Sequence, residues 1–105
     1  MKNYFEFLNK KLSVDLKSGL TVDERQLLEF LAMNASNGMP LCVAGAMSLS
    51  ALASPATLHR RIDDLIAKGY ISHKFEDDRR TKFLMPTSKA AAYFKKVAEL
   101  FEGQK

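Results

Sequence analysis

The chain has 105 residues, of which 47% are hydrophobic and 27% charged, and its formal net charge is +4. This length predicts a single domain, residues 1–105, and the basic excess suits an anionic partner such as nucleic acid. The single cysteine, Cys42, excludes an internal disulfide, and the longest uncharged apolar run, residues 41–47, is too short to span a bilayer. We therefore expect a cytoplasmic protein with no membrane segment.

The first third of the chain predicts two helices. Residues 4–12 repeat apolar side chains at helical spacing, and Ser18-Gly19 ends this segment. Thr21 and Glu24 then form a capping-box pattern, in which each side chain can satisfy an unpaired amide at a helix start. The apolar stripes are Phe5, Leu8 and Leu12 in the first helix, and Leu27, Leu28 and Leu31 in the second.

Two further helices are expected between residues 41 and 69. A short helix fits residues 41–53, but the pattern does not fix its register. Ser54-Pro55 opens the next helix, because serine is a good N-cap and proline is tolerated at the first helical position. Its inward face carries Leu58, Ile62 and Leu65, and Gly69 supplies a left-handed end.

After Gly69 the apolar period changes from 3.6 to 2, which predicts a hairpin. Residues 71–75 alternate apolar and polar side chains, as in a half-buried strand, and residues 76–80 form a polar tip. The second strand covers 81–85 and stops at Pro86, which cannot donate to a ladder. Thr87 then caps a final helix. The predicted fold class is mostly α with a small β-hairpin (α+β), a winged helix-turn-helix with a C-terminal helix.

This order of elements predicts binding to double-stranded DNA. A helix fits the major groove, and a basic hairpin reaches the adjacent backbone or minor groove. If Leu58 faces inward, a rotation of 100° per residue places Arg60 outward, with Thr57 and His59 on the flanks. The residues that we expect to contact DNA are Ser54, Ala56, Thr57, His59, Arg60, Arg61, Lys74, Arg79, Arg80 and Lys82.

Residues 54–90 resemble the recognition helix and wing of the MarR (multiple antibiotic resistance regulator) family. That family shows Ser-x-x-Thr-apolar-x-Arg, apolar-Asp-x-Leu and Lys-Gly-x-Ile, and then Asp-x-Arg and Thr-x-Lys-Gly. The matching residues are Ser54, Thr57, Leu58, Arg60, Ile62, Asp63, Leu65, Lys68, Gly69, Ile71, Asp78, Arg80, Thr87 and Lys89. Pro86 and Ala90 depart from the pattern, where the family has leucine and glycine. The resemblance covers about a third of the chain and implies a transcriptional regulator whose wing arginine, Arg80, enters the minor groove.

Several side chains keep simpler interpretations open. Arg61 fits a phosphate contact and a salt bridge equally well, and Asp63 fits a structural pair with a basic wing residue. His73, on the apolar side of its strand, is most simply packed or hydrogen-bonded. The two histidines and Cys42 lack metal-ligand spacing, so we expect no metal and no cofactor.

Surplus apolar residues at both ends of the chain predict a homodimer, which is also how the resembled family associates. The expected interface residues are Phe5, Leu8, Leu12, Tyr93, Phe94, Val97, Leu100 and Phe101. A small-molecule effector has no support in the sequence, because the chain is shorter than typical members of that family.

Three functions compete on these patterns. The first is a sequence-specific DNA-binding regulator, and the second is a winged helix that docks another protein. The third is a DNA-binding protein of plasmid or phage replication or segregation. An enzyme is not expected, because the chain has no glycine-rich phosphate loop, nucleophile–base pair or converging carboxylates. The cluster of basic residues after Ser54 favours DNA over protein docking.

Overall fold

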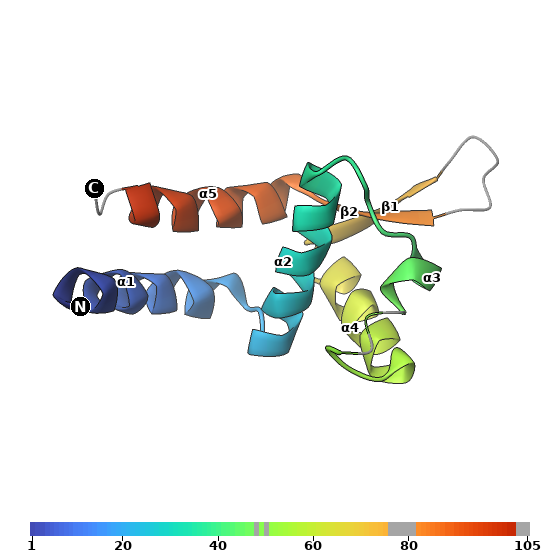
Figure 1. The fold of residues 1–105 in the computed structure, drawn as a ribbon, viewed down its shortest axis with the longest axis horizontal. Helices are drawn as coiled ribbons and strands as arrows, with labels where there is room; N and C mark the ends of the chain where they lie inside the picture. The colour runs from blue at the N-terminus through green and yellow to red at the C-terminus, as the bar shows by residue number, and fades with distance from the viewer. Residues whose placement is uncertain (48, 50, 76–81, 103–105) are drawn as a thin grey trace.

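The predicted order of elements is confirmed in the computed structural model, which describes residues 1–47, 49, 51–75 and 82–102. The elements are α1 (Lys2–Ser18), α2 (Val22–Ser36), α3 (Val43–Ala46), α4 (Pro55–Ala67), β1 (Ile71–Phe75), β2 (Lys82–Pro86) and α5 (Ser88–Glu102). Helices α1 and α5 run side by side in opposite directions as an arm, so that both chain ends lie together (Figure 1). The hairpin extends toward the opposite end of the molecule.

The helix boundaries follow from local capping. At the start of α2 the Thr21 hydroxyl accepts from the Glu24 amide at 3.1 Å, and Glu24 accepts from the Thr21 amide at 2.9 Å, which confirms the capping box. At the end of α4 Gly69 has a φ of 84°. This conformation lets the Tyr70 amide donate to the carbonyl of Leu65 at 2.9 Å, as in a Schellman motif. Tight ends of this kind fix where α4 stops and the hairpin starts.

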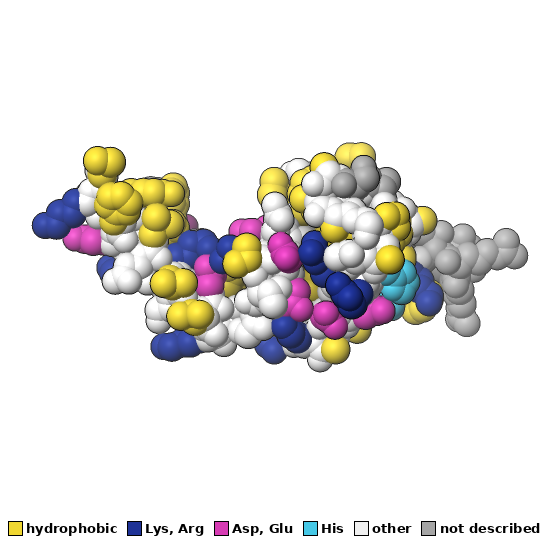
Figure 2. All heavy atoms as spheres, turned by 90° about the horizontal axis from the view of Figure 1, so that it is seen from below, with side chains coloured by type: hydrophobic (Ala, Val, Ile, Leu, Met, Phe, Trp, Pro, Cys, Tyr) yellow, Lys and Arg dark blue, Asp and Glu magenta, His cyan; other side chains and the backbone are white. Residues whose placement is uncertain are grey.

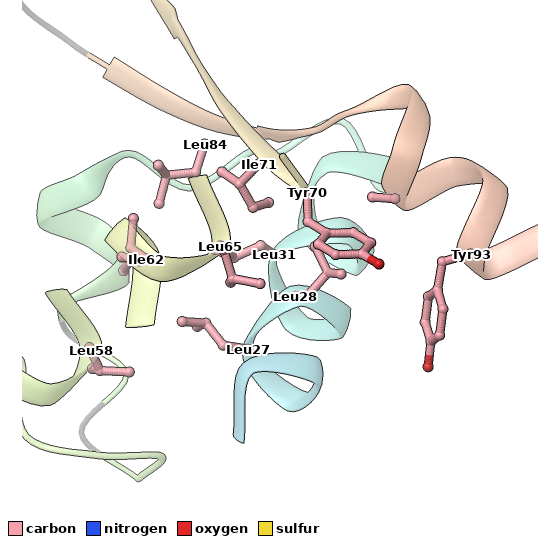
Figure 3. Packing of buried hydrophobic residues seen from close by; sticks show 12 residues of the cluster. Leu27, Leu28, Leu31, Leu58, Ile62, Leu65, Tyr70, Ile71, Leu84 and Tyr93 are labelled. Atoms are coloured by element: carbon pink, nitrogen blue, oxygen red, sulfur yellow. The ribbon is translucent and has the colours of Figure 1, made fainter. Parts of the chain in front are cut away.

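The hydrophobic core lies where α2, α4 and the base of the hairpin meet (Figure 3). Its fully buried large side chains are Leu27, Leu28, Leu31, Leu58, Leu65, Ile71 and Leu84. These residues confirm the predicted inward stripes of both helices. Burying one large apolar side chain contributes roughly 1.5–3 kcal/mol, so this cluster is the main source of stability.

The hairpin is less buried than its alternating pattern predicts. The antiparallel register pairs Ile71 with Pro86, His73 with Leu84 and Phe75 with Lys82. Of β1 only Ile71 is buried, and His73 and Phe75 are exposed. The prediction of a half-buried strand was therefore wrong beyond Ile71. The face assignment is correct, but the two strands are covered unequally. Strand β2 lies beside the segment before α3, where the Leu84 amide donates to the Leu41 carbonyl at 2.9 Å, and Leu84 is fully buried, whereas His73 opposite it is exposed.

A buried carboxylate joins the helical arm to the core. Asp15 of α1 accepts hydrogen bonds from Lys11 at 2.7 Å, from Arg25 of α2 and from the hydroxyl of Tyr93 of α5. Burial alone would raise the pKa of Asp15, but the hydrogen bonds from Lys11 and Tyr93 and the charges of Lys11 and Arg25 hold it below its ordinary value. Burial and the bond to Asp15 together raise the pKa of Tyr93.

A second polar contact holds the corner between α1 and α2 against the end of α4. The Lys68 ammonium donates to the buried carboxylate of Glu24, and the Tyr70 hydroxyl donates to the Ser18 carbonyl at 2.6 Å. Burial alone would raise the pKa of Glu24, but the bonds from Lys68 and Thr21 lower it. Both carboxylates therefore favour the folded state when they are ionised.

We expect Asp15→Asn to lower the free energy of unfolding at neutral pH by about 1–3 kcal/mol, because two cations lose the negative charge between them and the amide nitrogen cannot accept where a carboxylate oxygen did. The contribution of Asp15 is present above its unfolded pKa of 3.8 and is lost as the pH falls through the lower folded value. Urea unfolding between about pH 6 and pH 3 should therefore show the gap between wild type and variant closing below about pH 4.

The matched control is Asp64→Asn, which neutralises an exposed aspartate of α4. Its effect on the unfolding free energy should stay within about 0.5 kcal/mol. A gap between wild type and Asp15→Asn that is absent, or that keeps its size at every pH, would contradict the role given to Asp15.

Candidate nucleic-acid interface

The outward face of α4 is the surface that the sequence assigned to DNA. Leu58, Ile62 and Leu65 are buried against the core, and the opposite side of the helix is therefore turned to solvent. Ala56, His59 and Arg60 are all exposed there, as predicted from the helical rotation. Basic, acidic and histidine side chains lie close together over this part of the surface (Figure 2).

The hydroxyls of Ser54 and Thr57, at the start of α4, form hydrogen bonds within the helix terminus. The Ser54 hydroxyl accepts from the Thr57 amide at 3.4 Å and donates to the Thr57 hydroxyl at 3.0 Å. The N-cap prediction for Ser54 is confirmed. Because the Ser54 proton is used, the Thr57 hydroxyl keeps its own proton for a further acceptor, although its side chain is only partly exposed.

The adjacent arginines Arg60 and Arg61 have different surroundings. Arg61 lies closer to the core, and its guanidinium is 3.2 Å from the carboxylate of Asp23 on α2. The structure therefore shows the salt bridge, one of the two roles that the sequence left open for Arg61. Arg60 is exposed, and within the described part of the chain its side chain has no ion-pair or hydrogen-bond partner. Its charge is available to an external anion.

Asp63 pairs with a neighbour on its own helix. The Nδ1 atom of His59 lies 3.3 Å from a carboxylate oxygen of Asp63, one helical turn further along, and both side chains are exposed. The predicted pairing of Asp63 with a basic wing residue is not found among the described residues. Asp64 is exposed beside it, so the acidic groups of α4 lie in its C-terminal half and Arg60 in its N-terminal half.

The described part of the hairpin adds two lysines on opposite faces. Lys74 stands opposite Phe83, whereas Lys82 stands opposite Phe75 and its ammonium lies 5.7 Å from the centre of that ring. Both lysines are exposed. The predicted contacts of Arg79 and Arg80 fall outside the described residues.

A groove of about 660 Å³ lies between α3, α4 and the hairpin. Its lining residues are Cys42, Val43, Ala44, His59, Ile62, Asp63, His73 and Lys82. The expectation that His73 is packed or hydrogen-bonded was wrong: it stands opposite the buried Leu84 of β2, but its own side chain is exposed in this groove and has no bonding partner among the described residues. Sequence patterning missed it because alternation reports the face of a strand but not whether a neighbour covers that face.

Cys42 has a structural role at the mouth of the same groove. Its sulfur accepts a hydrogen bond from the Gly45 amide at 3.3 Å and so caps the start of α3. The residue is half-buried, and its backbone forms an isolated antiparallel β-bridge with Phe83. Among the described residues no group of three or more histidine, cysteine or acidic side chains could hold a metal ion. In the same part of the chain, no helix is long and apolar enough to cross a membrane.

The residues predicted for a dimer interface divide into two groups. Phe5, Leu8, Leu12 and Phe101 are exposed, and Phe94, Val97 and Leu100 are partly covered. Tyr93 does not fit the prediction, since it is 5% exposed and bonded to Asp15 inside the chain. Its buried hydroxyl needed an internal acceptor, which the apolar pattern of α5 did not reveal. The remaining apolar surface gathers along the arm (Figure 2).

No model of a known protein family matches the chain, and no curated protein matches its sequence. Solved structures do match. A transcriptional regulator from Thermotoga maritima has a TM-score of 0.71 and 22% identity, over 94% of this chain and 67% of its own. A MarR-like transcriptional regulator from the same organism has a TM-score of 0.68 and 17% identity, over 98% of this chain and 73% of its own.

The fold is MarR-like. A third structure, MepR, is a transcription regulator of the Staphylococcus aureus multidrug efflux pump MepA; it matches with a TM-score of 0.58 and 18% identity, over 97% of this chain and 79% of its own. The predicted winged helix-turn-helix fold and the resemblance to the MarR family are thus confirmed at the level of the fold. The chain spans between 67% and 79% of the length of these three MarR-like structures.

Proposed function

We propose that the chain is a transcriptional regulator that binds double-stranded DNA sequence-specifically as a homodimer. The observation that supports this most directly is Arg60 on the outward face of α4, which is exposed and has no partner among the described residues, next to a hairpin with two exposed lysines. Helix α4 has 13 residues and is about 20 Å long, and an α-helix with its side chains is about 10–12 Å across, so it fits a major groove about 12 Å wide.

The charges along α4 favour one way of approach. Asp63 and Asp64 in the second half of the helix would be repelled by phosphates, whereas Arg60 and the small Ala56 in the first half let this end come close to DNA. The N-terminal residues of a recognition helix are the ones that contact base edges. We therefore assign base readout to Thr57, and backbone contacts to His59, Arg60 and the hairpin lysines.

The homodimer is supported by the apolar surface of α1. Tyr4, Phe5, Leu12 and Leu16 are each more than half exposed within the chain, as is Phe101 at the end of α5. A second copy that covered these side chains would contribute roughly 1.5–3 kcal/mol for each one fully buried. A two-fold axis through the arm would hold two α4 helices about 34 Å apart, which is one turn of DNA.

Selection of bound duplexes from random DNA tests the proposal as a whole. Enrichment of a palindrome with half-sites about 10 base pairs apart is the expected result, because two identical recognition helices read two identical half-sites. If no duplex were enriched, the proposed function would be wrong, and a protein-docking role for the same face of α4 would take its place.

Arg60→Ala should weaken binding to all duplexes and make the slope of log affinity against log salt shallower by about 0.9, because one phosphate contact is lost. Fluorescence anisotropy at several salt concentrations measures this slope. Arg61→Ala is the matched control: it removes the same charge at the next position, but Asp23 already holds this arginine, so the slope should not change. Equal slopes for wild type and Arg60→Ala would contradict the assignment of Arg60 to the DNA interface.

Phe5→Glu should convert a dimer into a monomer in sedimentation experiments at micromolar concentration, because a charge would be buried in the subunit contact. Phe5 is 58% exposed within the chain, so the fold itself should be spared. Phe75→Glu changes a similarly exposed phenylalanine of the hairpin and should stay dimeric. A wild type that is monomeric, or a Phe5→Glu variant that stays dimeric, would contradict this interface.

A further inference from the structure

We propose that the groove between α3, α4 and the hairpin binds a phosphate of the DNA backbone, and that His73, together with His59, strengthens this contact as the pH falls. The inference rests on the proposed function and adds both a contact residue and a regulation of the same site. Its starting point is that the chain has two histidines, and that both line this one groove.

The position of His73 follows from the strand register. On one face of the hairpin, Ile71, His73 and Phe75 of β1 lie opposite Pro86, Leu84 and Lys82 of β2. Ile71 and Leu84 are buried against the helices, so this face is the one turned toward α4. His73 and Lys82 are on the same face, and both are exposed. The hairpin thus brings an imidazole and an ammonium to the side of the groove opposite His59.

The charges around the groove come close to cancelling when its histidines are neutral. Helix α4 contributes His59 and Asp63, β1 contributes His73, β2 contributes Lys82, and the half-buried thiol of Cys42 lies before α3. Lys82 brings one positive charge and Asp63 one negative charge, which sum to zero. Each protonated imidazole adds one positive charge, so the groove can reach +2.

Protonation also changes what each imidazole can donate. A neutral imidazole has one N–H donor, and an imidazolium has two and carries a charge. The Nδ1 atom of His59 is beside Asp63, so in the charged form it can donate to that carboxylate while Nε2–H remains for a phosphate. The side chain of His73 has no bonding partner in the described part of the chain, so both of its donors remain for an external acceptor.

The groove fits an anion better than a cation. His59, Asp63, His73 and Cys42 share its lining, but no three of the described histidine, cysteine or acidic side chains are placed to hold a metal ion together. Lys82 would repel a metal ion and attract a phosphate. A volume of about 660 Å³ leaves room for a phosphodiester with part of its sugar. The groove also lies beside the exposed face of α4, where the proposed function places the DNA.

The test is duplex binding at about pH 6 and about pH 8, over a range of salt concentrations, with the duplex enriched by selection. Imidazoles change charge across this interval. We expect wild type to bind about three- to tenfold more tightly at the lower pH, and the slope of log affinity against log salt to steepen by about 0.9 for each phosphate that a protonated histidine neutralises. His73→Gln should lose about half of this pH effect, and the double variant with His59→Gln should lose it all.

A second variant is expected to bind DNA more tightly than wild type, and a gain in affinity cannot be explained by misfolding. Asp63→Asn removes the negative charge from the groove and should tighten binding at about pH 8, whereas Asp64→Asn makes the same change outside the groove lining and should do so less. Wild-type binding that is indifferent to pH, or a double histidine variant that keeps the pH effect, would overturn the inference and leave the proposed function intact. If no duplex were bound at about pH 6 or at about pH 8, both this inference and the proposed function would be wrong.

Discussion

Helix α4 can bury only one of its faces, and most of the candidate site depends on this constraint. Leu58, Ile62 and Leu65 pack against α2 and the base of the hairpin, in a core built from hydrophobic side chains. The helix must therefore turn its charged side to solvent, with Arg60 unpaired among the described residues. The same packing places the base of the hairpin against α4. The groove is formed between this helix, α3 and the rest of the hairpin.

Buried polar contacts join the arm to the winged part of the molecule, in addition to apolar packing. Asp15 collects donors from three helices, and Lys68 ties Glu24 to the end of α4. Unlike apolar packing, these bonds are directional, so they fix the angle of the arm as well as its attachment. In the proposed dimer this angle sets the separation of the two α4 helices. Asp15 would therefore influence which spacing of DNA half-sites the dimer binds, although it is far from the DNA.

Neighbouring residues of the same type have separate roles in this fold. Arg61 is held by Asp23 while Arg60 is left to solvent, and Asp63 pairs with His59 while Asp64 does not. Likewise Tyr93 is buried in the core, whereas Phe101 on the same helix is exposed. The rotation of 100° per residue turns Arg61 toward Asp23 and Arg60 toward water, and it places Asp63 one helical turn from His59.

The sequence by itself determined the elements and the outward face of α4, because caps such as Thr21 and Ser54 and a helical apolar stripe are local signals. It could not determine the surroundings of His73 or Tyr93. Whether a strand residue is covered, or a hydroxyl finds a partner, depends on segments distant in the chain: the elements beside the hairpin cover Leu84 but not His73 opposite it, and Asp15 of α1 accepts from Tyr93. Only the tertiary structure brought both histidines to one groove, because helix and strand periodicity carry no information about which elements meet.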